Sequence, residues 1–133
     1  MKYMLDTNIC IYIIKEKPVK VFQTFRSLNI GDVCISSITF AELQYGVCKS
    51  QNKERNKMAL LNFLVPMEIL PFSSRAASYY GEIRAALENK GLIIGAYDLL
   101  IAAHALSEKL ILVTNNTKEF NRIPKLVLEN WAE

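Results

Sequence analysis

The chain has 133 residues, of which 51% are hydrophobic, and a formal net charge of +3 at pH 7. This length and composition predict a single domain over residues 1–133 with a substantial apolar core, and they argue against a repeat array or a disordered chain. No apolar run approaches the roughly 20 residues that cross a bilayer, and no secretory leader precedes Asp6. We therefore expect a cytoplasmic protein without a membrane anchor. Its mild basicity fits a nucleic-acid partner without requiring one.

Apolar strand-like runs alternate with helical patterns along the chain. In chain order we expect a strand at 2–5, helices at 7–15 and from Pro18 to about 28, a strand at 33–36, helices from Ser37 or Thr39 to 49 and at 52–64, a strand at 68–72, helices at 75–90 and 98–107, and strands at 110–114 and 126–128. Gly91 is expected to cap the helix before it. This alternation implies parallel strands joined by right-handed crossovers. We predict an α/β fold, a three-layer α/β/α sandwich with a central, mainly parallel sheet.

The other reactive side chains are given structural roles. The cysteines Cys10, Cys34 and Cys48 are odd in number and lack the spacing of a disulfide framework or a zinc site, so we expect small core residues. His104 lies six residues beyond Asp98, off its helix face, and is expected at the surface or the core edge. Basic clusters at 15–26 and 49–57 can be ordinary solvated helix faces or can guide a polyanionic substrate.

Three acidic residues lie where an apolar segment ends and a helix is expected to begin: Asp6, Glu42 and Asp98. The carboxyl ends of parallel strands meet at one edge of a sheet, so acids placed there can lie together although they are far apart in sequence. Clustered carboxylates repel one another unless a cation holds them, and oxygen ligands suit Mg²⁺ or Mn²⁺. The pattern therefore indicates metal-dependent phosphate chemistry.

Each acid also has a purely structural interpretation. Asp6 can be the N-cap of the helix that follows it, and Asp98 can stabilise its helix through the helix dipole. Thr39 and Glu42 have the spacing of a capping box, in which the glutamate returns to the amide of the N-cap residue. The residues alone do not decide between these structural roles and metal binding.

Four segments carry the acids and their neighbours: MLDTN at 4–8, ISSITFAEL at 35–43, IGAYDLLIAAHA at 94–105 and LVTNNTKEF at 112–120. In this order, and over essentially the whole chain, they resemble the signature blocks of PIN-domain ribonucleases. More narrowly, they are similar to those of the VapC toxins of bacterial toxin–antitoxin pairs. The resemblance implies a PIN-like fold and a metal-dependent endoribonuclease that a cognate VapB-type antitoxin neutralises.

Position by position, the resemblance implies that Asp6, Glu42 and Asp98 are catalytic acids, with Asp6 and Asp98 as metal ligands. Many family members carry a fourth acid two residues after the threonine of the last block, where this chain has Asn116. Glu119 is then the candidate for the missing catalytic carboxylate. Four further residues of these blocks are expected either to orient the carboxylates and bound waters or to serve in caps and turns: Thr7, Asn8, Thr114 and Asn116.

The expected reaction is hydrolysis of an RNA phosphodiester with Mg²⁺, for which Mn²⁺ can substitute, leaving 5′-phosphate and 3′-hydroxyl ends. The resemblance implies a transfer RNA as the target, with initiator tRNA cut in its anticodon loop as the leading candidate, so that translation and growth are inhibited. The implied partners are a VapB-type antitoxin, a second copy of the chain in a homodimer, and operator DNA reached only through the antitoxin. Apolar helices at 7–28 and 39–49 are expected to form a groove for the antitoxin.

Two other classes of protein share parts of this pattern. A haloacid-dehalogenase-like enzyme also follows its first strand with an aspartate, but it needs a second acid two residues later, where this chain has Asn8. A catalytically silent PIN-fold module would bind RNA or an antitoxin without cutting RNA, and the three intact acids argue against it. Arg84 is expected on an exposed helix face unless it approaches the acids or RNA. Some aromatic residues are candidates for stacking on RNA bases or contacting the antitoxin, although most are expected in the core: Phe40, Tyr45, Tyr79 and Tyr80.

Overall fold

The computed structural model describes residues 1–29 and 31–133. The described residues form one five-stranded sheet, in the order β3-β2-β1-β4-β5, whose neighbouring strands all run parallel. The strands are β1 (Tyr3–Leu5), β2 (Val33–Ser36), β3 (Glu68–Leu70), β4 (Ile111–Val113) and β5 (Leu128–Glu129). The described part of the chain also contains seven helices, namely α1 (Thr7–Lys15), α2 (Val19–Arg26), α3 (Ser37–Lys49), α4 (Lys53–Leu64), α5 (Ser74–Asn89), α6 (Ala96–Ser107) and α7 (Thr117–Phe120).

β1 lies at the centre of the sheet. Tyr3 is in register with Val33 of β2 on one side and with Ile111 of β4 on the other. Every residue of β1 and β2 is buried, as expected for strands that are covered on both faces. For this reason both segments read as nearly continuous apolar runs in the sequence.

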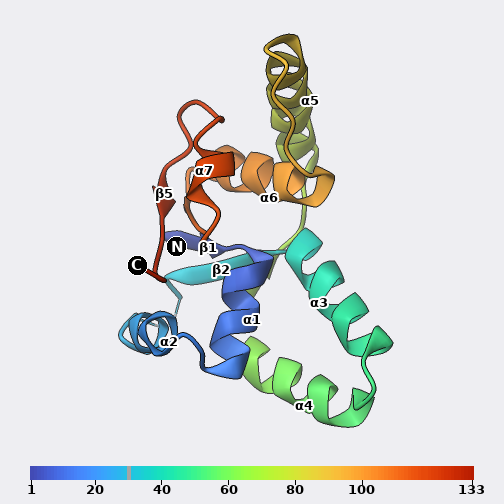
Figure 1. Ribbon diagram of the computed structural model, residues 1–133, viewed down its shortest axis with the longest axis vertical. Helices are drawn as coiled ribbons and strands as arrows, with labels where there is room; N and C mark the ends of the chain where they lie inside the picture. The colour runs from blue at the N-terminus through green and yellow to red at the C-terminus, as the bar shows by residue number, and fades with distance from the viewer. Residues whose placement is uncertain (30) are drawn as a thin grey trace.

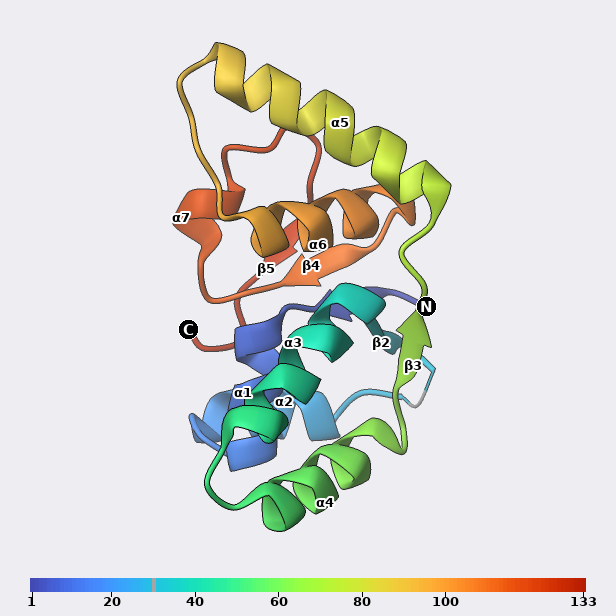
Figure 2. The ribbon, with the colours of Figure 1, turned by 90° about the vertical axis from the view of Figure 1, so that its right-hand side faces the viewer.

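The chain runs outward from β1 in two directions, first through β2 to β3 and then through β4 to β5. Because crossovers between parallel strands are right-handed, connections that run in opposite directions cover opposite faces of the sheet. Accordingly α1, α2 and α4 lie on one side of the sheet and α5 and α6 on the other, with α3 toward one end (Figure 1, Figure 2). The predicted three-layer sandwich is confirmed.

Each face of the sheet has its own apolar core. Leu5 packs with Ile9 of α1 and Leu60 of α4 on one face, whereas Met4 packs with Ile101 of α6 on the other. Successive side chains of a strand point to opposite faces, so adjacent residues of β1 serve different cores. α6 is buried along most of its length and lies between the sheet and α5 (Figure 2).

The predicted helices and strands are found with small differences at their ends. Gly91 ends α5 as predicted: its φ is +71°, and the Leu92 amide donates to the Leu87 carbonyl at 2.9 Å, which is a Schellman motif. The short helix α7 was not predicted, and Cys48 is exposed rather than in the core. Within the described residues, no helix combines the length and the apolar character needed to cross a membrane.

Candidate functional site

The order of the strands defines a switch point between β1 and β4. These neighbouring strands are followed by connections that leave toward opposite faces of the sheet, which opens a crevice at their carboxyl ends. Asp6 comes directly after β1, and Thr114 comes directly after β4. The first predicted acid therefore lies at the place where parallel α/β sheets bind their ligands.

Asp6 has the N-cap role that its sequence position allowed. As the N-cap of α1, its Oδ1 accepts a hydrogen bond of 2.9 Å from the Ile9 amide, and its own amide donates to the Val113 carbonyl at 3.0 Å. Its side chain is nonetheless only 4% exposed. Burial raises the pKa of Asp6 to about 6, against the lowering effect of hydrogen bonds from Thr114 and Ile9, and the charges of Asp98 and Glu42 raise it further.

Glu42 is held by a contact from another helix. The Thr7 hydroxyl, in the first turn of α1, donates a 2.6 Å hydrogen bond to Oε1 of Glu42 in α3. The predicted capping box is wrong, because α3 begins at Ser37 and its N-cap is Ser36, whose Oγ accepts from the Ile38 amide at 3.1 Å. Ser36 ends β2 with a side-chain oxygen already in place for this role. The carboxylate of Glu42 is thus left for contacts across the site.

Asp98 and Glu119 lie on the other wall of the crevice. Asp98 is half-buried in the first turn of α6, and its pKa is raised by burial and then by the charges of Glu119 and Glu42. Glu119 Oε1 accepts from the Gly95 amide at 3.2 Å, and its Oε2 accepts from Asn116 Nδ2 at 3.0 Å. α7 carries Glu119 to the beginning of α6, so the four predicted acids come from α1, α3, α6 and α7 to one edge of the sheet.

The predicted polar neighbours are at the same edge. Thr114 is fully buried; its hydroxyl oxygen accepts from the Asn116 amide at 2.9 Å, and its hydroxyl faces Asp6. Thr7 is half-buried and engaged with Glu42, whereas Asn8 is exposed on α1. Of these residues, Thr7 contacts an acid from another helix, which is more than a local cap requires, whereas Asn116 contacts Glu119 of the helix that it caps.

The donor set suits a hard divalent cation. It consists of carboxylate oxygens with hydroxyl and amide neighbours, which are the ligands of Mg²⁺ and Mn²⁺. Burial raises the pKa of the nearby Cys10 thiol well above its ordinary value, so it stays protonated and is not a soft ligand. Across residues 1–29 and 31–133, no three His, Cys, Asp or Glu side chains converge tightly enough to hold one ion by themselves. Mg²⁺ commonly uses one or two carboxylates and completes its shell with waters.

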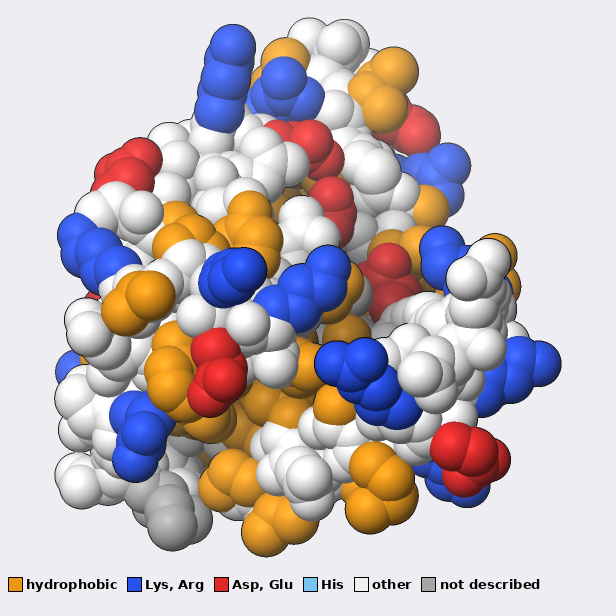
Figure 3. Space-filling view, turned by 60° about the horizontal axis from the view of Figure 1, so that its bottom comes forward, with side chains coloured by type: hydrophobic (Ala, Val, Ile, Leu, Met, Phe, Trp, Pro, Cys, Tyr) orange, Lys and Arg blue, Asp and Glu red, His pale blue; other side chains and the backbone are white. Residues whose placement is uncertain are grey.

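A hollow adjoins the acids. Thr7, Asn8, Glu42 and Tyr97 line a cavity of about 580 Å³ between α1, α3 and the start of α6. It continues into a second cavity of about 360 Å³ between α1, α3 and α4, and both are bordered by Lys49. On the side of the molecule where α4 lies, apolar side chains gather with Lys and Arg side chains around them (Figure 1, Figure 3). The predicted groove is therefore present between α1 and α3, but α2, which was also expected to form it, lines neither cavity.

Sequence reasoning missed Tyr97 as part of this region. It was not among the aromatic candidates, yet it is 60% exposed and lines the larger cavity. The signal that could have found it is its position, directly before Asp98 in the first turn of a helix that is otherwise buried. Tyr45 was a candidate, and it lines the same cavity.

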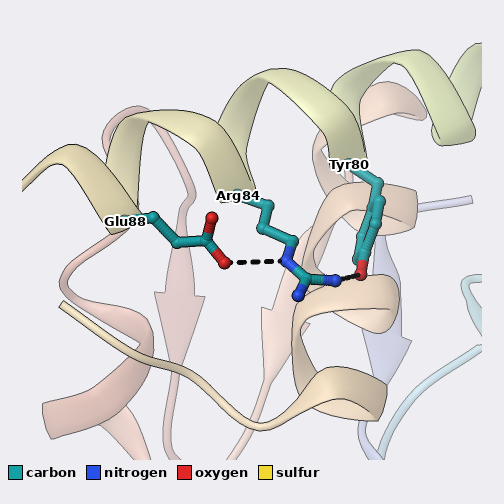
Figure 4. A network of polar contacts seen from close by, with 3 residues as sticks. All are labelled: Tyr80, Arg84 and Glu88. Atoms are coloured by element: carbon teal, nitrogen blue, oxygen red, sulfur yellow. Dashed lines mark hydrogen bonds and ion pairs between the residues drawn. The ribbon is translucent and has the colours of Figure 1, made fainter. Parts of the chain in front are cut away.

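His104 and Arg84 lie away from the acids. His104 is fully buried, which corrects the expected surface or edge position: its Nδ1 is 2.8 Å from Ser36 Oγ, and its ring packs edge-on against Phe72. The alanine-rich helix α6 packs tightly on the sheet and leaves no route to solvent on that side. Arg84 is on the exposed face of α5, where it binds Glu88 at 3.0 Å and the Tyr80 hydroxyl at 2.7 Å (Figure 4).

Comparison with known proteins agrees with this geometry. Residues 3–126 match the PIN domain family. Ribonuclease VapC2 of Rickettsia felis is 55% identical over 132 residues, covering 98% of each chain, and the tRNA(fMet)-specific endonuclease VapC of Shigella flexneri is 48% identical, covering 99% of each. The crystal structure of VapBC2 from Rickettsia felis bound to a DNA fragment from their promoter superposes with a TM-score of 0.92 and 54% identity, over 98% of this chain and 99% of that one. The chain belongs to the PIN domain family, among its VapC ribonucleases.

Proposed function

We propose that this protein is the toxin of a VapBC-type toxin–antitoxin pair, a divalent-metal-dependent endoribonuclease that cuts a transfer RNA and thereby inhibits translation. The observation that carries the proposal is the meeting of Asp6, Glu42 and Asp98 at the switch point of the sheet, where burial and the neighbouring carboxylates raise the pKa of Asp6 and of Asp98. A buried carboxylate with a raised pKa, beside other acids in a crevice, is typical of a functional site.

Asp6 and Asp98 are the proposed ligands of Mg²⁺, with Mn²⁺ as a substitute. They approach the crevice from the ends of β1 and the start of α6, on its two walls. When bound, the ion lowers the pKa of a water and neutralises charge on the scissile phosphate. A cation also removes the repulsion that otherwise opposes ionisation of Asp6 and Asp98.

The remaining residues orient these groups. Thr7 holds the Glu42 carboxylate toward the crevice through its 2.6 Å hydrogen bond. Glu119 and Asn116 form a pair at 3.0 Å, and Glu119 also binds the Gly95 amide, so this pair fixes the beginning of α6 beside Asp98. Asn116, at the position of the family's fourth acid, is neutral, and Glu119 supplies the fourth negative charge in its place. These contacts pre-arrange oxygen atoms on both sides of the phosphate, which reduces the cost of ordering them during the reaction.

The proposed substrate is initiator tRNA, cut in its anticodon loop to give 5′-phosphate and 3′-hydroxyl ends. Support comes from the relative of Shigella flexneri that is named a tRNA(fMet)-specific endonuclease, at 48% identity over almost the whole chain. An anticodon loop offers unpaired nucleotides, and sequence-specific RNA recognition depends mostly on such nucleotides.

The proposed partner is a VapB-type antitoxin. Two related structures are VapBC assemblies on DNA, from Rickettsia felis and Salmonella typhimurium. The apolar cavity between α1, α3 and α4 suits an amphipathic segment of such a partner. Contact with operator DNA is proposed only through the antitoxin, and a homodimer of the toxin is proposed as its assembled form.

Cleavage of total bacterial RNA by antitoxin-free protein tests the catalytic proposal. Wild-type, Asp6→Ala and Arg84→Ala proteins are compared in Mg²⁺, Mn²⁺ and EDTA, and the cut ends are mapped by sequencing. We expect a dominant metal-dependent cut in an anticodon loop for the wild type and Arg84→Ala, and none for Asp6→Ala. Folded wild-type protein that binds RNA without cutting it under any metal condition would instead be the catalytically silent module.

A further inference from the structure

Two exposed tyrosines line the cavity beside Glu42. Tyr45 lies one helical turn after Glu42 on α3 and is 65% exposed, and Tyr97 directly precedes Asp98 and is 60% exposed. Both line the same cavity of about 580 Å³, a volume within the roughly 300–1,000 Å³ typical of ligand sites. Two large aromatic side chains left in solvent around one hollow are unusual for a surface without a binding role.

The rest of the cavity has an apolar floor and a polar edge. Ile11 of α1 and Ile38 of α3 contribute apolar surface, whereas Thr7 and Asn8 add hydroxyl and amide groups near the acids. Such a lining suits a flat, partly apolar group that also carries hydrogen-bonding edges. A phosphate group alone would not be stabilised by the apolar side chains of Ile11 and Ile38.

A positive charge stands at the same cavity. Lys49 borders it, and its ammonium nitrogen lies 5.0 Å from the centre of the Tyr45 ring. This cation–π contact lies at an exposed position, so the Lys49 ammonium group can also pair with a neighbouring anion. Aromatic rings beside a cation, next to a site for phosphodiester cleavage, are the combination that binds single-stranded nucleic acid.

We propose that this cavity is a base-binding subsite, in which an unpaired RNA base next to the scissile phosphate stacks on Tyr97 and Tyr45 while Lys49 neutralises the adjoining phosphate. The proposal rests on the ribonuclease function proposed above and deepens it. Bases of a duplex are already stacked and paired, so the subsite selects unpaired nucleotides. It also connects the recognised base to the cut, because Tyr97 and Asp98 are consecutive and Tyr45 and Glu42 share a helix face.

Binding of RNA to an uncutting protein tests the subsite. Asp6→Asn is the parent, because asparagine keeps the N-cap of α1 while removing the charge. The probes are a fluorescent anticodon stem-loop of bacterial initiator tRNA, a single-stranded oligoadenylate, and an RNA duplex. In this parent, Tyr97→Leu and Tyr45→Leu are compared with Tyr97→Phe and Tyr45→Phe, which retain the aromatic ring. Both positions are exposed, so the thermal unfolding of all four variants is expected to stay unchanged and is measured alongside.

We expect each leucine variant to bind the unpaired probes roughly 5- to 150-fold more weakly than the parent, the range found for loss of one stacked base. The phenylalanine variants should bind as the parent does, and duplex affinity should not change. An abasic nucleotide at the loop position that enters the cavity should weaken binding by the parent but not by Tyr97→Leu.

The inference is overturned if leucine and phenylalanine variants bind unpaired RNA alike, or if no single abasic position interacts with Tyr97. Unchanged RNA affinity together with weakened binding of a VapB-type antitoxin would assign the cavity to the antitoxin instead. Failure of the proposed function is a separate result: in the otherwise wild-type protein, RNA cleavage would then persist in Asp6→Ala or be absent throughout. A protein that cleaves normally after Tyr97→Leu and Tyr45→Leu would retain the function and lose only the subsite.

Discussion

The Thr7 hydroxyl donates a 2.6 Å hydrogen bond to the Glu42 carboxylate and so ties α1 to α3 across the crevice. The same turn of α1 is capped by Asp6, whose Oδ1 accepts from the Ile9 amide. One helix end therefore positions two of the proposed catalytic acids, one directly and one through a threonine. A change at Thr7 should affect Glu42 without touching the fold of α1.

Thr7→Val removes the hydroxyl and retains the side-chain shape. We expect RNA cleavage to slow by roughly 10- to 150-fold, because a hydrogen bond to a charged group contributes about 1.5–3 kcal/mol. Thr7→Ser, which keeps the hydroxyl, should stay close to the wild-type rate. Single-turnover cleavage of the mapped substrate measures both, and equal rates for the valine and serine variants would rule out this role for the hydrogen bond.

The raised pKa of Asp6 predicts how stability depends on pH. Because its value in the folded protein is about 6 rather than 3.8, the folded state binds more protons than the unfolded state between these limits. Without metal, stability should fall as the pH rises through that window and remain lower above it. Asp6→Asn should remove this slope and be about 2–3 kcal/mol more stable than wild type near pH 8. Chemical unfolding in EDTA measures the difference, and an Asp6→Asn protein no more stable than wild type would contradict it.

Mg²⁺ should oppose this loss of stability. A ligand that binds only the folded state at about 100 times its Kd adds about 2.7 kcal/mol. We expect a Mg²⁺-dependent rise in melting temperature for wild type that is larger near pH 8 than near pH 5, because protons compete for Asp6. Asp6→Asn and Asp98→Asn should lose most of the rise, and Arg84→Ala should keep it. A rise of equal size in all four proteins would place the ion elsewhere.

His104 and Ser36 form the polar connection between α6 and the end of β2. The imidazole Nδ1 lies 2.8 Å from Ser36 Oγ, and within the described residues its buried Nε2 has no hydrogen-bond partner. A double-mutant cycle of His104→Leu and Ser36→Ala should give a coupling energy of about 0.5–1.5 kcal/mol, as for a neutral hydrogen bond. Additive losses in unfolding free energy would show that the two residues act separately.

Burial lowers the pKa of His104, and this predicts a pH dependence of opposite sign to that of Asp6. The unfolded state binds a proton on His104 at a higher pH than the folded state does. Stability from this residue should therefore be lost as the pH falls below its usual value near 6.5. His104→Leu should lack that part of the acid-side loss, which the difference in unfolding curves between the two proteins will show.

Gly46 lies in α3 where the two connected cavities meet. An added Cβ meets no atom within 4 Å, and glycine inside a helix costs about 0.5–1 kcal/mol relative to alanine. Gly46→Ala should therefore raise stability by about that amount, as measured by chemical unfolding. Gly46→Leu should fill the groove and weaken antitoxin binding by at least tenfold in a titration, while Gly46→Ala binds normally; equal affinities would move the antitoxin to another surface.

The sequence predicted the centre of the sheet well because β1, β2 and most of β4 are buried on both faces. Apolar runs such as LILVT are too short for a buried helix and so indicate strands, and α4 and α5 end next to Pro66 and Gly91. It also placed Asp6, Glu42 and Asp98 at junctions that the structure brings to one edge. Their roles in metal binding and catalysis remain predictions.

The local errors share a physical cause. Thr39-x-x-Glu42 has the spacing of a capping box, but the N-cap depends on where β2 ends, and Ser36 was already there. His104 was expected at the surface or the core edge because it lies off the helix face of Asp98, whereas it is fully buried and packs against Phe72. α7 has only four residues, too few for a periodic pattern. In each case the outcome depends on where an element begins and ends or on what packs against it, which a local periodic pattern does not show.

The central position of β1 also affects how the protein is made. β1 pairs with β2 at residues 33–36 but with β4 only at residues 111–113. A chain emerging from the ribosome can therefore form the wall that carries Asp6 and Glu42 long before β4 arrives to close the sheet beside Asp98. The proposed catalytic site is therefore complete only when synthesis of the chain is nearly finished. A chain that stops before β4 lacks Thr114, Asn116 and Glu119 and so cannot present the full set of proposed catalytic groups.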